Sequence, residues 1–146
     1  MIVVASDHAG VGLKAQIIRV VEESGRQVRD LGPANESSVD YPDFAHLVAE
    51  VVAGGEAQMG ILICGTGIGM SMSANRHPGV RAALCHDAFT AEMARRHNDA
   101  NVLCMGARVL GVGVAEQITR IFLDSEFEGG RHQRRVEKIE IERGES

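Results

Sequence analysis

Short apolar runs alternate with amphipathic stretches along the whole chain, and this alternation restricts the possible folds more than any other feature. Most runs are short and rich in branched residues, which is typical of strands buried on both faces of a parallel sheet. We expect strands over residues 2–6, 27–31, 59–64, 80–85 and 102–105, and helices over 11–24, 43–53, 68–75, 88–96 and 112–124. The pattern predicts the α/β class: a single doubly wound, Rossmann-like domain over residues 1–146, with a five-stranded parallel sheet.

We expect the common strand order 2-1-3-4-5 for this sheet. In that order the connections after the first and third strands leave toward opposite faces, and ligands bind at this switch point, beyond the carboxyl ends of the strands. Ser6-Asp7-His8 follows the first expected strand, and Cys64-Gly65-Thr66 follows the third. The order therefore predicts that two polar loops converge on one ligand.

Composition argues against several classes of partner. The net charge is −5 with no basic block, and Trp is absent, so we expect no nucleic acid partner. The first apolar run meets Asp7 and His8 too early for a signal peptide or a membrane span, so we expect no membrane association and a cytoplasmic protein.

The cysteines indicate free thiols rather than a disulfide framework or a metal centre. Cys64, Cys85 and Cys104 each end an apolar run, and their odd number and scattered positions are typical of a reducing compartment. Neither a Cys-x-x-Cys nor a His-x-x-x-His spacing occurs, so we expect no metal site. We assign Cys85 and Cys104 to the core.

The segment Cys64-Gly65-Thr66-Gly67-Ile68-Gly69 joins an expected strand to an expected helix. Glycines at every second position permit a sharp turn and bring backbone N–H groups close to a ligand. Together with the positive end of the helix, these groups favour an anion, and the same field favours a reactive thiolate. The alternative is a buried cysteine before an ordinary strand–helix turn, because free cysteines are commonly buried.

Three families of glycine loop do not fit this segment. A dinucleotide fingerprint requires Gly-x-Gly-x-x-Gly, whereas position 70 is Met. A nucleotide P-loop ends in Gly-Lys-Ser/Thr, and no lysine lies near Gly69. A cysteine phosphatase loop has an arginine six positions after the thiol, where this chain has Met70.

Five motifs occur in order along nearly the whole chain. They are Ser6-Asp7-His8-Ala9-Gly10, Asp40-Tyr41-Pro42, Cys64-Gly65-Thr66-Gly67-Ile68-Gly69, Arg96-His97-Asn98-Asp99-Ala100-Asn101 and Gly129-Gly130-Arg131-His132-Gln133-Arg134-Arg135. Together they resemble the B-type ribose-5-phosphate isomerases, which share a family with the galactose-6-phosphate isomerase subunits. The resemblance implies an aldose–ketose isomerase of the pentose phosphate pathway that needs no cofactor.

The resemblance also implies how the C2 proton moves to C1 through an enediolate. Cys64 is similar to the general base of the family. The Thr66 hydroxyl and the backbone N–H groups from Gly65 to Gly69, including those of Gly67 and Ile68, would hold the enediolate. One branch of the family replaces the thiol by serine and uses a carboxylate inside the loop. Here that loop position is Ile68, so Cys64 keeps the role.

Further roles follow from the same resemblance. His97, assisted by Asp7, would open the sugar ring, and Asn98 would hydrogen-bond the substrate. The phosphate-binding positions are His8, Arg108, Arg131 and Arg135, and Tyr41 is a weaker candidate for the pocket wall. Members of the family are dimers or tetramers whose sites draw residues from two subunits, so we expect a homodimer or a tetramer.

Alternatives remain open at several of these positions. Without the family pattern, His97 would be an exposed histidine at a helix end beside Arg95 and Arg96, and Arg108 a solvated loop arginine. Arg131 and Arg135 stand four apart, on one face of an expected C-terminal helix, where they either hold an anion or belong to a solvated charged helix. For the whole protein the alternatives are a hexose-6-phosphate isomerase acting on allose or galactose 6-phosphate, and a non-catalytic module that binds sugar phosphates.

Overall fold

The computed structural model describes residues 1–141, in which five parallel strands form one sheet. The strands are β1 (Ile2–Ser6), β2 (Val28–Asp30), β3 (Met59–Cys64), β4 (Ala82–Leu84) and β5 (Val102–Gly106). The helices are α1 (Val11–Glu23), α2 (Tyr41–Ala53), α3 (Ile68–Ala74), α4 (Ala88–Arg96), α5 (Val112–Asp124) and α6 (Arg131–Glu137), with a short 3-10 helix, η1, over His8–Gly10. The predicted α/β class and its parallel sheet are confirmed, and most element ends lie within two residues of the predicted ones.

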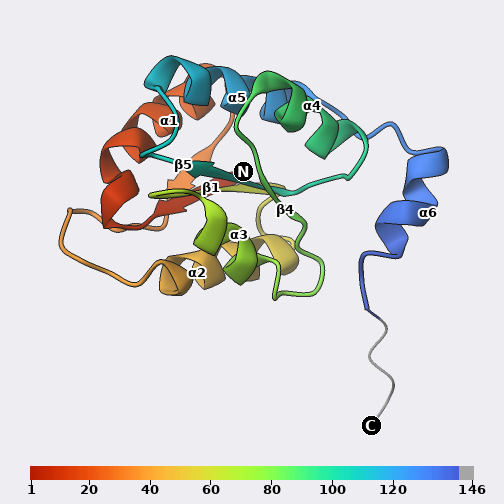
Figure 1. Ribbon diagram of the computed structural model, residues 1–146, viewed down its shortest axis with the longest axis horizontal. Coiled ribbons are helices and arrows are strands. Elements are labelled where there is room, and N and C mark those ends of the chain that lie inside the picture. The colour runs from red at the N-terminus through yellow and green to blue at the C-terminus, as the bar shows by residue number, and fades with distance from the viewer. Residues whose placement is uncertain (142–146) are drawn as a thin grey trace, which may run out of the picture.

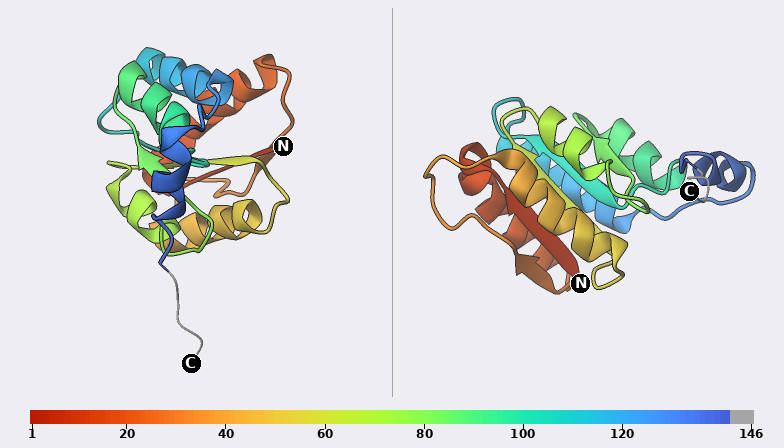
Figure 2. Two further views of the ribbon diagram at one scale, coloured as in Figure 1. Left: turned by 90° about the vertical axis from the view of Figure 1, so that its right-hand side faces the viewer. Right: turned by 90° about the horizontal axis from the view of Figure 1, so that it is seen from below.

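Helices cover both faces of the sheet (Figures 1 and 2). Because side chains alternate along a strand, Ile2 and Val4 pack into the layer formed by α1, α4 and α5, whereas Val3 and Ala5 pack against α2 and α3. Phe122 of α5 is the largest fully buried side chain of the first layer. The strands are therefore apolar on both faces, as the uninterrupted runs predicted.

The order of the last two strands differs from the prediction. The sheet runs β2-β1-β3-β5-β4, not 2-1-3-4-5, so β5 lies between β3 and β4. Every residue of β5 is buried, as a central position requires, whereas the three residues of β4 are only partly buried and suit the sheet edge. A central β5 brings the chain after Gly106 directly beside the end of β3.

The C-terminal helix α6 stands apart from the two helical layers, beyond the end of the sheet (Figure 2). Only His132 and Val136 of this helix are buried, and Arg131 and Arg135 are exposed. The predicted C-terminal helix is confirmed over these residues. Residues 142–146, the end of the expected 1–146 domain, lie outside the described part of the chain.

No helix within residues 1–141 has the length and apolar character needed to span a membrane.

The contact between β3 and α2 leaves no room for a side chain at Gly60. A Cβ atom there would collide with the γ-methyl group of Val48, a stiff β-branched residue in the core. We predict that Gly60→Ala lowers the free energy of unfolding by about 1–3 kcal/mol. Gly12→Ala is the matched control, because no atom lies within 4 Å of a Cβ at this helical position. Urea unfolding that shows equal stability for both variants would contradict this account of the packing.

Candidate active site

The loop between β3 and α3 holds the Cys64 thiol by a backbone hydrogen bond. The N–H of Gly67 donates to Cys64 Sγ over 3.1 Å, and Gly67 has φ of 80°, which a side chain would strain. The N–H of Ile68 donates to Thr66 Oγ1 over 3.2 Å. Two of the N–H groups predicted to hold an enediolate are thus already engaged within the loop. Because the Thr66 hydroxyl accepts from Ile68, its own hydrogen is left to donate to a ligand.

Neighbouring side chains press closely on the glycines of this loop. The guanidinium of Arg108 covers Gly65, with its Nη1 3.3 Å from the position that a Cβ would occupy. The ring of Tyr41 covers Gly69 in the same way, at 2.5 Å. A larger residue at position 65 would displace the Arg108 guanidinium, and one at position 69 would displace the Tyr41 ring. Tyr41, the weaker candidate for a pocket wall, therefore lies against the loop.

The polar loop after β1 lies beside this loop, as predicted. The Asp7 N–H donates to the Ile63 carbonyl over 3.0 Å, and the Asp7 carboxylate accepts from the N–H of Ala9 over 2.9 Å. His8 Nδ1 accepts from the N–H of Val39 over 3.2 Å. An accepting Nδ1 places the proton of the neutral ring on Nε2, so His8 has an N–H to donate elsewhere.

Arg108 comes to the same place because β5 pairs with β3. The Arg108 N–H donates to the Gly65 carbonyl over 3.0 Å, and the N–H of Ala107 donates to the Cys64 carbonyl over 2.8 Å. The described ion pairs do not involve Arg108, Arg131 or Arg135, so within residues 1–141 no carboxylate neutralises these guanidinium groups. Such groups bind phosphate well through paired N–H donors.

The remaining candidates lie at the opposite edge of the sheet. His97 and Asn98 follow α4 and precede β5, at its amino end, whereas Cys64 ends β3. Gly60 pairs with Val102 and Cys64 with Gly106, and four residues at ~3.3 Å each separate these two levels by about 13 Å. Arg131 and Arg135 lie on α6, beyond the same amino edge (Figure 1). One chain therefore unites Asp7, His8, the loop from Cys64 to Gly69 and Arg108, but not His97, Asn98, Arg131 and Arg135.

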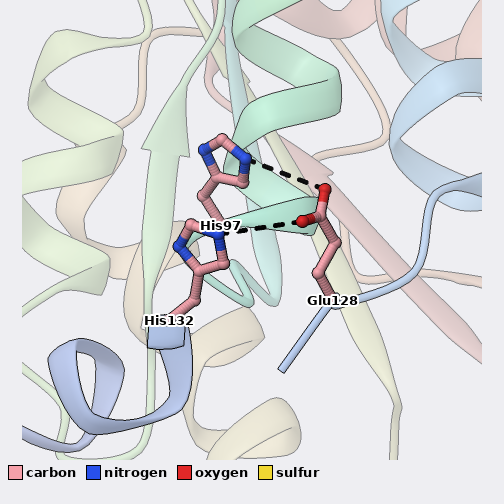
Figure 3. Close-up of side chains that lie close together, drawn as sticks. All are labelled: His97, Glu128 and His132. Atoms are coloured by element: carbon pink, nitrogen blue, oxygen red, sulfur yellow. Dashed lines mark ion pairs between the residues drawn. The ribbon is translucent and has the colours of Figure 1, made fainter. Parts of the chain in front are cut away.

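A cluster at the amino edge joins His97 to two residues without a predicted role. The rings of His97 and His132 stack with centroids 4.2 Å apart and an angle of 11° (Figure 3). Glu128 faces both, with its two carboxylate oxygens 3.8 Å from His97 Nε2 and 3.7 Å from His132 Nε2. Burial lowers the pKa of His132, and the neighbouring His97 and Arg131 lower it further. The sequence holds only a weak signal for this cluster, the four-residue spacing of Glu128 and His132.

Comparisons with known proteins agree on one family. The model of the family described as Ribose/Galactose Isomerase matches residues 2–139. Ribose-5-phosphate isomerase B of Escherichia coli is 47% identical over 133 residues, covering 91% of this chain and 89% of that protein. The solved structure of ribose-5-phosphate isomerase B from Clostridium thermocellum is 49% identical with a TM-score of 0.93, covering 94% of this chain and 93% of the other. The type B ribose 5-phosphate isomerase of Trypanosoma brucei is also 49% identical, with a TM-score of 0.92 and coverage of 94% and 95%.

The three free thiols differ in their surroundings, and we predict that Cys64 is alkylated first. Burial raises the pKa of Cys85 to about 11, so at pH 8 only about one such thiol in 10³ is ionised. Full burial also raises the pKa of Cys104. Cys64 lies under a loop whose Thr66 and Ile68 are exposed.

Brief treatment with iodoacetamide at pH 8 followed by peptide mapping measures this order. The Cys64→Ser variant is the control and is expected to show no early modification. Equal rates at Cys64 and Cys85 would contradict the prediction.

Proposed function

The chain belongs to the ribose/galactose isomerase family, and we propose from this that it interconverts ribose 5-phosphate and ribulose 5-phosphate without a cofactor. The observation that carries the proposal is the Cys64 thiol, held by the Gly67 N–H beside the buried Asp7, with Arg108 over the same loop. A pure binding module needs phosphate-binding cations but no thiol in this position. We include in the proposal one domain over residues 1–146, a cytoplasmic location and a place in pentose phosphate metabolism.

Cys64 serves as the general base in the proposed reaction. Its thiolate removes the C2 proton of the open-chain aldose, the hydroxyl proton of the enediolate passes from O2 to O1, and the resulting thiol returns a proton to C1 to give the ketose. The Gly67 N–H donates to the sulfur and so holds it in place within the loop. The free hydrogen of the Thr66 hydroxyl donates to the enediolate oxygen. The N–H groups of Gly65 and Gly69 complete the proposed set of donors.

Phosphate binding is divided between two parts of the molecule. Arg108 and the Nε2–H of His8 lie beside the Cys64 loop and would contact the phosphate from this side. Arg131 and Arg135 are exposed on α6, on the far side of the sheet, with no described carboxylate partner. Guanidinium groups that are exposed and not paired with a carboxylate bind phosphate bidentately.

A second copy of the chain would complete the site. His97, which donates the proton for ring opening, and Asn98 lie at the amino edge and cannot meet Cys64 of the same chain. We propose that His97, Asn98, Arg131 and Arg135 of one copy face Cys64 of another, in a homodimer or a tetramer. The exposed side chains of Ile68 (46%) and Met72 (66%) on α3, next to the loop, supply an apolar surface for such a contact.

We predict that Cys64→Ala reduces turnover of ribose 5-phosphate by about 10³-fold, the usual contribution of a general base. Inorganic phosphate should still bind within about twofold, because the thiol acts on C2 and the phosphate contacts His8 and the arginines. The assay is ketose formation from ribose 5-phosphate, allose 6-phosphate and galactose 6-phosphate, with Cys85→Ala as the control variant.

The outcomes separate the candidate functions. Turnover of ribose 5-phosphate by the wild type supports the proposal, and turnover confined to a hexose phosphate replaces the substrate while keeping the mechanism. No turnover of any sugar favours a binding module. An active Cys64→Ala variant removes Cys64 as the base.

The shared site predicts that two inactive variants complement each other. In a dimer of one Cys64→Ala chain and one His97→Asn chain, one of the two sites holds both Cys64 and His97. Differently tagged chains, co-expressed and purified through both tags, should therefore recover about half of the wild-type turnover per dimer. Each variant alone is the control. A two-tag dimer that stays as inactive as its parents would show that the two residues do not meet across subunits.

A further inference from the structure

We propose that His132 and Glu128 are positioning residues that hold the His97 ring for proton transfer to the sugar. The proposal rests on the proposed function of His97 in ring opening. It assigns a role to two residues that touch His97 but not the substrate.

His132 supports the ring of His97 from one side. The two rings are nearly parallel, 11° apart, with centroids separated by 4.2 Å (Figure 3). The His132 side chain, on α6, is 10% exposed, whereas the His97 side chain, after the end of α4, is 38% exposed. A rigid, buried ring thus backs one that is half open to solvent, which limits the rotation of His97.

Glu128 places a negative charge beside the Nε2 atoms of both rings, at ion-pair distance. Its two carboxylate oxygens lie 3.8 Å and 3.7 Å from the Nε2 atoms of His97 and His132. Arg96 holds this carboxylate in turn, because its Nε lies 2.8 Å from Oε1 and its carbonyl accepts from the Glu128 N–H over 3.0 Å. Arg96 is itself paired with Glu92 over 2.8 Å. Glu128 is therefore held through its carboxylate and its backbone N–H by Arg96, the residue that precedes His97.

Three ligand atoms so close together also suggest a metal centre, but the ring geometry argues against one. The ligand atoms of His97, Glu128 and His132 all lie within 4.8 Å of one another. A metal ion lies close to the plane of each imidazole that binds it, about 2.0–2.1 Å from the nitrogen. Parallel stacked rings direct their Nε2 lone pairs side by side, so an ion in the plane of one ring lies out of the plane of the other. The geometry fits a shared carboxylate better than a shared cation.

The arrangement selects one atom of His97 for the reaction. A carboxylate facing Nε2 favours the tautomer with its proton on that nitrogen. Nδ1, on the side of the ring turned away from Glu128, is then the atom that exchanges protons with the sugar (Figure 3). For ring opening His97 carries a proton on both nitrogens; the bond between C1 and the ring oxygen breaks, its electron pair takes the Nδ1 proton, and His97 is left neutral with its remaining proton on Nε2. The O1 hydroxyl loses its proton to Asp7 as the C1 carbonyl forms.

The charges around His97 come from three segments. Arg96 and Glu92 belong to α4, Glu128 to the connection between α5 and α6, and His132, Arg131 and Arg135 to α6. Burial lowers the pKa of His132, and this favours its neutral form. A neutral ring adds no positive charge beside His97 when His97 carries a proton.

The test compares a reaction that requires ring opening with one that does not. Ribulose 5-phosphate is an open chain, because its C5 hydroxyl carries the phosphate and cannot close a five-membered ring. Exchange of its C1 hydrogen with deuterated water therefore reports proton transfer by Cys64 alone. We expect Glu128→Gln and His132→Phe each to lower kcat for ribose 5-phosphate about tenfold, a usual effect of removing a residue that orients a functional imidazole, with KM and the C1 exchange unchanged. Gln133→Ala, an exposed change on the same helix, should match the wild type.

A double-substitution cycle separates positioning from a general structural role. In a His97→Asn chain, which should retain C1 exchange but lose ring opening, adding Glu128→Gln or His132→Phe should cause no further loss. An equal tenfold loss in that background would overturn the proposal, and so would a parallel loss of C1 exchange. Glu128 is exposed, so Glu128→Gln gives a folded variant even if His132→Phe disturbs α6.

The tautomer of His97 gives a readout that does not depend on activity. Long-range proton–nitrogen NMR should show Nε2 protonated in the wild type and a mixture of tautomers in Glu128→Gln. An unchanged spectrum would refute the positioning role even if the enzyme is an active isomerase. If the wild type converts no sugar phosphate while the spectrum changes as expected, the proposed function fails and the role of Glu128 in holding the ring stands.

Discussion

The parallel pairing of β3 with β5 determines where Cys64 lies relative to the other groups of the candidate site. The ladder runs from Gly60 and Val102 to Cys64 and Gly106, and it continues beyond the strands through the N–H groups of Ala107 and Arg108. These bonds bring an exposed guanidinium over the loop that holds the thiol. If β4 stood next to β3, Arg108 would leave the sheet one strand farther away, and the loop would lack its cation.

The polarity of a parallel sheet accounts for the division of the candidate residues into two groups. Every segment that follows a strand lies at the carboxyl edge, and every segment that follows a covering helix lies at the amino edge. Asp7, Cys64 and Arg108 follow strands, whereas His97 follows α4 and the tail arginines follow α5. A chain built in this way carries a proposed base at one edge and a proposed acid at the other. The shared site of the proposed dimer is a direct consequence of this polarity.

The half of the site that holds the proposed acid, His97, has its own supports. The His97 imidazole has His132 stacked on one face and Glu128 beside its Nε2 atom. Arg96 holds Glu128 in turn. In the proposed base half, the Gly67 N–H, the Arg108 guanidinium over Gly65 and the Tyr41 ring over Gly69 play the corresponding part. Each of the two proposed reactive groups is thus contacted by residues without a proposed chemical step of their own, an arrangement that keeps catalytic geometry precise.

The sequence by itself determined the types of the elements, the parallel sheet and the convergence of the loops after β1 and β3. These follow from local patterns, since a period of two or of 3.6 residues and a glycine-rich turn are written in neighbouring positions. The order of β4 and β5, the distance between His97 and Cys64, and the cluster of His97, Glu128 and His132 were decided only by the tertiary structure. β5 is central and buried on both faces, whereas β4 is only partly buried at the edge. The order of these two consecutive strands depends on how each packs against the rest of the sheet, which no local pattern records. His97 meets His132 because α6 folds back on the end of α4, and no local spacing records a contact between residues 35 positions apart.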